Sequence, residues 1–411
     1  MRVQRCKGTR DLSPDEMLRF RLIEGYFRGR CLKWGYQEIR TPTIEYLHLF
    51  TSAGTLTPSM LSKVYSFLDW DGWSGERVVL RPDGTIPVAR LYIDGMEGEG
   101  LAKLFYVSNI FIFEETGEET RERWQCGVEL IGVGSPLTDV ELVSLSLEIM
   151  KELSLEGVEL RLSHAGLIKS LLVELGLNPE EQTNILDQIL DGNGEALGRI
   201  KTERPDLENI LLPLLNMKGK SSGFLRNLKA LSVQSVPKVK QHLDDFISIV
   251  ELLDALEYDY RIDIASGVGF EYYTGVIFQL FIGEEKIGGG GRYEALIPAM
   301  GGGDIPASGF ALYLDRLMDL VKPKILAKPS APRILVRGEG KDVLKEAFHV
   351  ASRLREVGYV VQFNLGGQEP ANLRWVLDVK SKASLFILQD KVKSTRIEAQ
   401  TIDEVLQAIQ S

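Results

Sequence analysis

The sequence predicts an α+β protein: an antiparallel sheet with flanking helices, a helical insertion and a C-terminal α/β domain. Three observations support this fold class. Residues 76–134 alternate short apolar runs with charged loops, which is typical of antiparallel strands. Residues 166–256 are nearly all helical in pattern. Residues 333–411 alternate between strand-like and helix-like periods, as in a small α/β domain.

The composition indicates a globular chain with a sizeable core. Its 411 residues suggest about two to four domains. The hydrophobic content of 44% supplies enough apolar material for burial and excludes wholesale disorder. The net charge of −10 counts against nucleic-acid binding, because proteins that bind nucleic acids usually carry excess positive charge.

The cysteines and histidines give no support for a metal centre. Three cysteines lack a CxxC pair, and four histidines lack an HxxxH or HxH pattern. We therefore expect no metal and no cofactor. The sparse, odd number of cysteines fits a reducing cytoplasm, where we expect the protein to reside. We expect no membrane association, because no apolar run approaches the roughly 20 residues of a membrane span.

The first helix has a strong start signal at Ser13. Ser13 can cap the helix, a proline follows at the first helical position, and Glu16 completes a capping box. Apolar residues then recur at helical spacing until Gly35 ends the pattern. Residues 35–45 read as a strand interrupted by a proline, which belongs at an edge or a break of a sheet.

The remaining elements follow in order along the chain. A helix is expected from about Pro136 to Leu153, and strand patterns resume at Tyr260–Ile264 and Thr274–Phe281 before a glycine run. In the C-terminal domain we expect strand Ile334–Val336, helix Lys341–Gly358, strand Tyr359–Asn364, helix Pro370–Lys382, strand Ser384–Gln389 and helix Ile402–Ile409. The expected domain division is 1–165 and 257–322 for the two parts of the sheet-based core, 166–256 for the helical insertion, 323–332 for a linker and 333–411 for the α/β domain.

Five segments in matching order resemble histidyl-tRNA synthetase, a class II aminoacyl-tRNA synthetase. Each is weak alone, but the five together are specific, and the tail resembles that family's anticodon-binding domain. The resemblance implies a class II synthetase fold, a dimer through the first motif and a site where histidine and ATP meet on the sheet. The segments are KGTRDLSPDE (7–16), GYQEIRTPTIE (35–45), LRPDGT (80–85), QCGVELIG (125–132) and the stretch from GFEYYTG to LYLDRL (269–317).

The histidine half of the implied site looks intact. Asp83 is one methylene shorter than the glutamate that is usual in the family. By resemblance, the histidine-binding residues are Asp83, Thr85 and Gln125 for the α-amino group, Glu129 and Tyr273 for the imidazole, and Tyr272 and Tyr293 as lining.

The residue types suit this ligand independently of the resemblance. Gln125 and Glu129 lie four apart in a strand-like segment, so their side chains share one face. A carboxylate and a phenol together can satisfy both imidazole nitrogens. Such a pair alone is more often a solvated face, and adjacent tyrosines are more often core aromatics; the surrounding motifs favour a ligand site. Cys126 points away from Gln125 and is expected to be core packing.

The ATP half departs from the family at three positions. Ile112 stands where the family has an arginine, Val268 replaces a second arginine, and Tyr313 replaces a glycine that leaves room for adenine, although Arg316 is kept. Losing one transition-state donor costs about 10²–10³ in rate. We therefore expect no catalytic residues in this chain. The alternative is a working enzyme with compensating cations, and the candidate cations are Arg81, Arg121 and Arg123.

Two further segments bear on the ligands. Ala371 and Asn372 stand where synthetases tend to carry lysines, so no tRNA binding is expected. The glycine run 288–291 lacks the G-K-[ST] of a phosphate loop, and it is interpreted as backbone that approaches the amino-acid pocket closely.

A chain with the histidine pocket and without adenylation resembles the regulatory subunits of ATP phosphoribosyltransferase. That resemblance implies a short-form catalytic subunit as partner in the first step of histidine biosynthesis, with histidine as the feedback ligand. Two alternatives stay open: an active histidyl-tRNA synthetase and a free-standing histidine-binding module.

Overall fold

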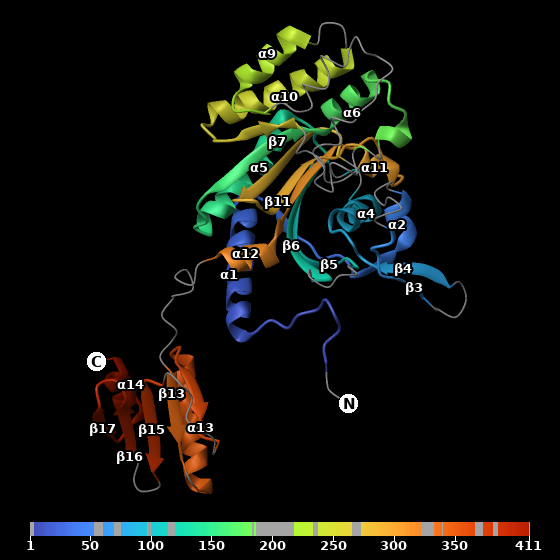
Figure 1. Ribbon diagram of the computed structural model, residues 1–411. Helices are drawn as coiled ribbons and strands as arrows, with labels where there is room; N and C mark the ends of the chain where they lie inside the picture. Colours follow the sequence, from blue (N-terminus) through green and yellow to red (C-terminus); the bar gives the residue numbers. More distant parts are fainter. Residues whose placement is uncertain are drawn as a thin grey trace. The chain divides into compact units, whose positions relative to one another are not determined.

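The protein divides into two compact units, residues 1–326 and 327–411, and the division falls inside the range where a linker is expected (Figure 1). Each unit is described by itself. The computed structural model describes residues 4–52, 61–69, 75–96, 98, 100–113, 120–182, 185, 218–232, 237–264, 273–321, 333–338, 340–365, 373–380 and 385–410.

The first unit is built on a large sheet with nine strands in its described residues. Its central strands are antiparallel, as expected, while β1 pairs with β5 and β7 pairs with β9 in parallel. In spatial order the strands are β1 (Gln37–Glu38), β5 (Ala102–Phe111), β6 (Glu122–Ile131), β12 (Ala307–Tyr313), β11 (Glu285–Arg292), β10 (Val276–Ile282), β7 (Val158–His164), β9 (Arg261–Asp263) and β8 (Lys218–Gly219).

Long helices cover one face of this sheet. Helix α1 (Pro14–Lys33) begins with the expected capping box, in which the Ser13 side chain accepts from the Glu16 backbone N–H and Glu16 accepts from the Ser13 N–H at 2.7 Å. Gly35 follows α1 with a φ of +79°, which explains why the helix stops there. The other helices are α5 (Pro136–Glu152), α6 (Ala165–Glu174), α9 (Ser222–Ser232), α10 (Pro237–Ala255) and α12 (Leu314–Leu320).

The opposite face holds a second apolar cluster around α4 (Thr85–Gly95), which sequence periodicity did not reveal. Figure 1 shows α4 within the curve of β5 and β6. The neighbouring elements are α2 (Leu47–Ser52), α11 (Leu296–Ala299) and a small sheet of β2 (Ile44–Tyr46), β4 (Glu76–Leu80) and β3 (Ser66–Asp69).

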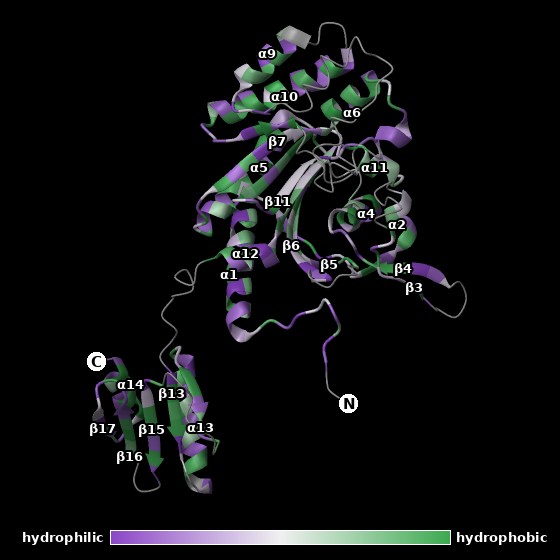
Figure 2. Ribbon diagram, in the orientation of Figure 1, coloured by the Kyte–Doolittle hydropathy of each residue, from purple (hydrophilic) through white to green (hydrophobic). Residues whose placement is uncertain are grey.

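The described part of the insertion expected at residues 166–256 is mainly helical and contains one short strand. Residues 218–219 form β8, which extends the large sheet at its edge, and the sequence pattern did not predict this strand within a nearly all-helical segment. Polar and apolar residues alternate around α10 (Figure 2). Its apolar side is buried against α5 and α6 through Val239, Leu243, Phe246, Val250 and Leu253.

The second unit is an α/β domain with one wrong sequence prediction. The helix expected at 370–382 is wrong, because Trp375–Lys380 is strand β15. Trp375, Leu377 and Val379 enter the core at every second position, which is the period of a strand. The other elements are β13 (Arg333–Arg337), α13 (Lys341–Glu356), β14 (Val360–Phe363), β16 (Leu385–Asp390), β17 (Thr395–Ala399) and α14 (Ile402–Gln410), with β17 also unforeseen.

Candidate functional site

A cavity of about 350 Å³, its open mouth included, lies on the α4 side of the large sheet. The cavity combines carboxylate, amide, hydroxyl and phenol groups with bare backbone. It is lined by Asp83, Thr85, Gln125, Tyr273, Gly289, Tyr293, Gly309, Phe310, Ala311 and Tyr313.

The alternation of strand β6 explains how two of these polar groups reach the cavity. Cys126 and Val128 enter the core beneath the long helices, so Gln125 and Glu129 face the other way. Cys126 is fully buried packing, as the sequence predicted, and burial raises the pKa of its thiol.

Asp83 has two structural roles at the edge of the cavity. Its Oδ1 accepts from the Ile86 backbone N–H at 2.8 Å, so it caps the start of α4 while it lines the cavity. Burial raises the pKa of this carboxyl to about 6, although the backbone N–H groups of residues 84–86 favour its charged form. A ligand cation beside Asp83 would favour the charged form further.

Glu129 lies behind the cavity wall rather than in it. It is 1% exposed, and its oxygens accept hydrogen bonds from Thr85 Oγ1, at 2.8 Å, and from the Tyr293 hydroxyl. Burial raises the pKa of Glu129 to about 8. A Cβ at Gly309 would stand 1.9 Å from Glu129 Oε2, so this position in β12 needs glycine.

Gln125 and Tyr273 complete the polar wall. Gln125 is 7% exposed, and its side-chain amide has no hydrogen-bond partner among the described residues. Tyr273 is held from outside the cavity, because Lys169 Nζ donates to its backbone carbonyl at 3.1 Å. Burial and the nearby Glu129 raise the pKa of the Tyr273 phenol, so it is neutral and able to donate.

The structure therefore brings together six of the seven residues that the resemblance assigns to histidine. Five line the cavity, and Glu129 holds two of them in place. Tyr272 lies outside the described residues. Sequence reasoning missed the lining by Gly309, Phe310 and Ala311, although these residues stand in the last segment that carries the resemblance, 269–317. In the structure β12 pairs with β6 and sets Gly309 opposite Glu129.

The glycine run 288–291 forms half of strand β11, between β10 and β12. A Cβ at Gly290 would stand 2.1 Å from the Gly309 carbonyl oxygen, so bare backbone lets these strands lie close. Gly289 lines the cavity. The run is thus structural backbone with one position at the site.

The arginines named above as candidates to replace the family's missing phosphate-binding arginines make contacts with other parts of the chain. Arg81 is 3% exposed and donates to the backbone carbonyls of Asn109 at 2.7 Å and Thr41 at 3.0 Å. Arg121 lies over the Phe113 ring at 4.7 Å. None of the described residues that line the cavity is an arginine or a lysine.

Arg123 and Arg316 also have partners of their own. Arg123 donates to the Thr120 carbonyl at 3.2 Å, and Arg316 pairs with Glu285 at 3.4 Å. The second position at which the family's arginine is missing, Val268, lies outside the described residues.

Tyr313 occupies space where the synthetase resemblance implies adenine. It lines the cavity and pairs with Gln125 across the β12–β6 ladder. It also lies close enough to Tyr273 to influence the pKa of that phenol. The bulky phenol of Tyr313 narrows the cavity on the side where the resemblance implies adenine.

Comparison with known proteins identifies the family. A protein of Dehalococcoides mccartyi strain BAV1, an ATP phosphoribosyltransferase regulatory subunit, is 50% identical over 98% of this chain and 98% of its own length. The chain belongs to the ATP phosphoribosyltransferase regulatory subunit family. The wider relationship is to synthetases: the histidyl-tRNA synthetase family model matches residues 8–317. Histidine–tRNA ligase of Methanosarcina acetivorans is 33% identical over 100% of this chain and 99% of its own.

Solved structures support the class II synthetase-like fold of this regulatory-subunit family member. An ATP phosphoribosyltransferase regulatory subunit/histidyl-tRNA synthetase from Bacillus halodurans matches with a TM-score of 0.78 at 23% identity, over 92% of this chain and 99% of that chain. Apo S. aureus histidyl-tRNA synthetase matches with a TM-score of 0.70 at 19% identity, over the full length of both chains.

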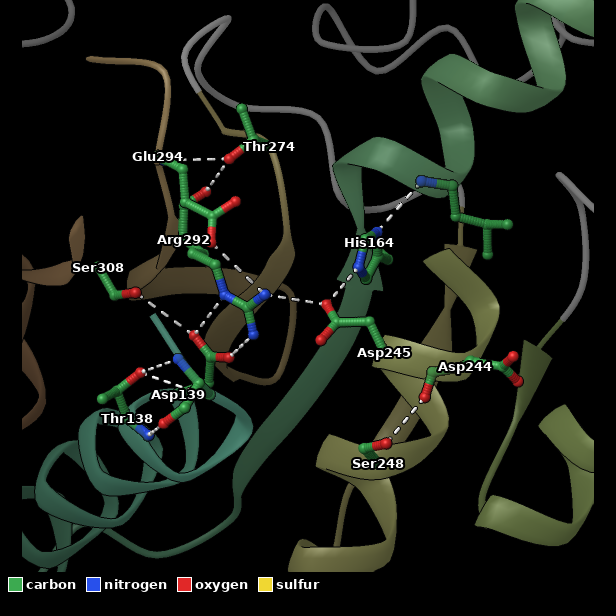
Figure 3. A network of polar contacts seen from close by, with 12 residues as sticks. Thr138, Asp139, His164, Asp244, Asp245, Ser248, Thr274, Arg292, Glu294 and Ser308 are labelled. Atoms are coloured by element: carbon green, nitrogen blue, oxygen red, sulfur yellow. Dashed lines mark hydrogen bonds and ion pairs between the residues drawn. The ribbon is translucent and has the colours of Figure 1, made fainter. Parts of the chain in front are cut away.

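A buried polar network lies across the sheet from the cavity (Figure 3). Arg292 is 7% exposed and pairs with Asp139 of α5 and, at 3.1 Å, with Asp245 of α10. His164 Nδ1 accepts from the Leu167 N–H, so its Nε2 proton is donated to Asp245 at 3.1 Å. Burial lowers the pKa of His164 and keeps it neutral. The network ties the helical insertion to β11, one residue before Tyr293.

The described residues contain neither a membrane-spanning helix nor a cluster of metal-binding side chains. No helix there is long and apolar enough to cross a membrane. No group of three or more His, Cys, Asp or Glu side chains in that part of the chain is arranged to hold a metal ion.

Proposed function

We propose that this chain is a non-catalytic regulatory subunit that binds histidine in the cavity and controls a short-form ATP phosphoribosyltransferase catalytic subunit. The observation that carries the proposal is the chemistry of the cavity wall. Groups suited to an ammonium and an imidazole line it, while no described lining residue supplies the positive charge that phosphates need.

Histidine fits this wall in one orientation. Its ammonium lies against Asp83, Thr85 and Gln125, where a carboxylate, a hydroxyl and a free amide oxygen accept its three protons. Its imidazole lies against the phenols of Tyr273 and Tyr293. Glu129 positions Thr85 and Tyr293 from behind, and its carboxyl, whose pKa is raised to about 8, can become negatively charged when a cationic ligand enters.

The contrast with adenylate formation supports a regulatory role. Phosphoryl chemistry depends on cations placed at developing negative charge. Arg81 is committed to backbone carbonyls, Ile112 carries no charge, and Tyr313 narrows the nucleotide side of the cavity. The glycosyl transfer from phosphoribosyl pyrophosphate to ATP therefore takes place on the catalytic partner, and this chain contributes no catalytic residue.

Feedback follows if histidine binds two assembly states with different affinity. A coupling of about 1–3 kcal/mol changes affinity by about 5–150-fold, which suffices for control. We also propose, from the family resemblance and the sequence, that the chain forms a dimer through its first motif, works in the cytoplasm and does not bind tRNA.

An active histidyl-tRNA synthetase is the second candidate. The family model and the 33% identical ligase favour it. It requires a histidine-dependent exchange of pyrophosphate into ATP, whereas the regulatory proposal requires none.

The test is a rate assay of a purified short-form catalytic subunit with and without this chain. We expect the chain to raise the rate and to make it sensitive to histidine. Tyr273→Phe should need more histidine for the same inhibition, whereas Glu346→Ala, exposed on α13, should behave as the native chain. An unchanged rate on adding the chain, or equal inhibition in its absence, would contradict the proposal.

A further inference from the structure

We propose that the cavity recognises the ammonium and the imidazole of its ligand and makes no use of the carboxylate. Its ligand class is then imidazole-bearing primary amines, with histidine as one member. This inference rests on the proposed histidine site. It adds a statement of which chemical groups of the ligand that site recognises.

The charge balance of the wall is the first support. The half-buried carboxylate of Asp83 lines the cavity, and the buried carboxylate of Glu129 lies directly behind it. The other described lining residues are neutral. A wall of this kind attracts a cation and offers a carboxylate no opposite charge.

The second support is the unpartnered amide of Gln125. This side chain is more than nine-tenths buried in the cavity wall and has no hydrogen-bond partner among the described residues. The amide faces the cavity, where a ligand can supply its hydrogen-bond partners. The Gln125 oxygen lies on the same wall as Asp83, where it accepts from an ammonium.

The surrounding cations do not change this balance. Lys169 Nζ donates to the Tyr273 carbonyl at 3.1 Å, and Arg81 is bound to the carbonyls of Asn109 and Thr41. Ile112 and Val268, which stand in place of the family's two arginines, are uncharged, and the nearby segments 114–119 and 265–272 contain no Lys or Arg in their sequence.

The ligand carboxylate therefore points to the open mouth of the cavity. An ion pair exposed to water contributes so little that its loss changes affinity by about fivefold or less. Removing one partner of a buried charge pair instead weakens binding by about 30-fold to more than 1,000-fold. Because Asp83 also repels a carboxylate, an amine without one binds equally well or better.

Calorimetric titration of the full chain with four probes tests the inference. The probes are L-histidine, L-histidinol, histamine and imidazole-4-lactate. We expect histidinol and histamine to bind within about fivefold of histidine, or more tightly. Imidazole-4-lactate keeps the carboxylate and replaces the amine by a hydroxyl, so it should bind at least about 30-fold more weakly.

Asp83→Asn is the matched variant, because asparagine keeps the acceptor that caps α4 at Ile86 and removes the charge. An unchanged melting temperature shows that it folds. We expect it to lose about 30-fold or more in affinity for histidine and histidinol alike. Equal loss for both amines supports the assignment of Asp83 to the ammonium.

The outcomes separate the inference from the proposed function. If histidine binds and histidinol is at least 30-fold weaker, the histidine site stands and carboxylate indifference is wrong. Selective loss of histidine binding in Lys169→Met would also overturn the inference, because it would make Lys169 the carboxylate partner. If none of the four probes binds, both the proposed function and the inference fail.

Discussion

Two buried carboxylates on opposite faces of the large sheet are stabilised in different ways. Asp139 is 2% exposed and is paired with the guanidinium of Arg292. Glu129 is 1% exposed and is held by the hydroxyls of Thr85 and Tyr293, both of which are neutral. The pKa is raised to about 6 for Asp139 and to about 8 for Glu129, because burial disfavours the charge in both cases.

The difference distinguishes a structural acid from an acid kept for a ligand. Asp139 has its counter-charge within the chain, so the network it joins is complete and ties α5, α10 and β11 together. Glu129 has hydrogen bonds but no cation partner among the residues that the structure describes, so its negative charge becomes favourable when a cationic ligand enters. Arg292 and Tyr293 are adjacent in sequence and serve opposite faces, so one short segment supports both arrangements.

The largest expected effect is on the structural side. Arg292→Met leaves Asp139 buried without its counter-charge, which should lower the free energy of unfolding by about 3–5 kcal/mol. Chemical denaturation of the full chain measures this. Adding Asp139→Asn to Arg292→Met should recover part of the loss. A loss below 1 kcal/mol for the single variant would remove the contrast between the two acids.

The second effect is on the ligand side. Glu129→Gln keeps the shape of the side chain and both hydroxyl contacts, so stability should change by less than about 1 kcal/mol. The affinity for histidine should fall by about 10–100-fold, since a hydrogen-bonded charge is lost. Calorimetry and denaturation on one preparation check both halves. A stability loss as large as that of Arg292→Met would show that Glu129 is structural too.

Much of this arrangement was predictable, for local reasons. The capping box at Ser13 and Glu16 depends on residues three apart. Gln125 and Glu129 share a face because β6 alternates regularly. The resemblance then assigned these residues to one site, and the cavity brings them together with Asp83.

The parts that sequence could not supply depend on long-range packing. Glu129 meets Thr85 and Tyr293 across separations of 44 and 164 residues, and Arg292 meets Asp139 across 153. The periodicity of the sequence does not indicate which of the two acids, Glu129 or Asp139, pairs with a cation. Strand β15 was missed for a related reason. Its alternating buried side chains can be recognised only when the core that they enter is known.

The smallest expected effect is a pH dependence. The raised pKa of Glu129, from 4.5 to about 8, means that the folded chain holds a proton that the unfolded chain has released. Stability from this group therefore falls as pH rises from about 4.5 to 8. The raised values of Asp83 and Asp139, about 6, and the lowered value of His164 act at lower pH.

The interval from pH 6.5 to 8 isolates Glu129. We expect the free energy of unfolding of the native chain to decline across it and that of Glu129→Gln to decline less. Denaturant titrations at half-unit pH steps measure the two slopes. Parallel slopes would mean that Glu129 is already charged in the empty cavity.

Histidine-dependent exchange of labelled pyrophosphate into ATP, measured on the purified full chain, tests the account most directly. The account holds that the chain recognises histidine and lacks the cations that activate it. It predicts binding of histidine by calorimetry with no exchange above the level of a histidine-free control. Exchange at the rate of a histidyl-tRNA synthetase assayed alongside would contradict it.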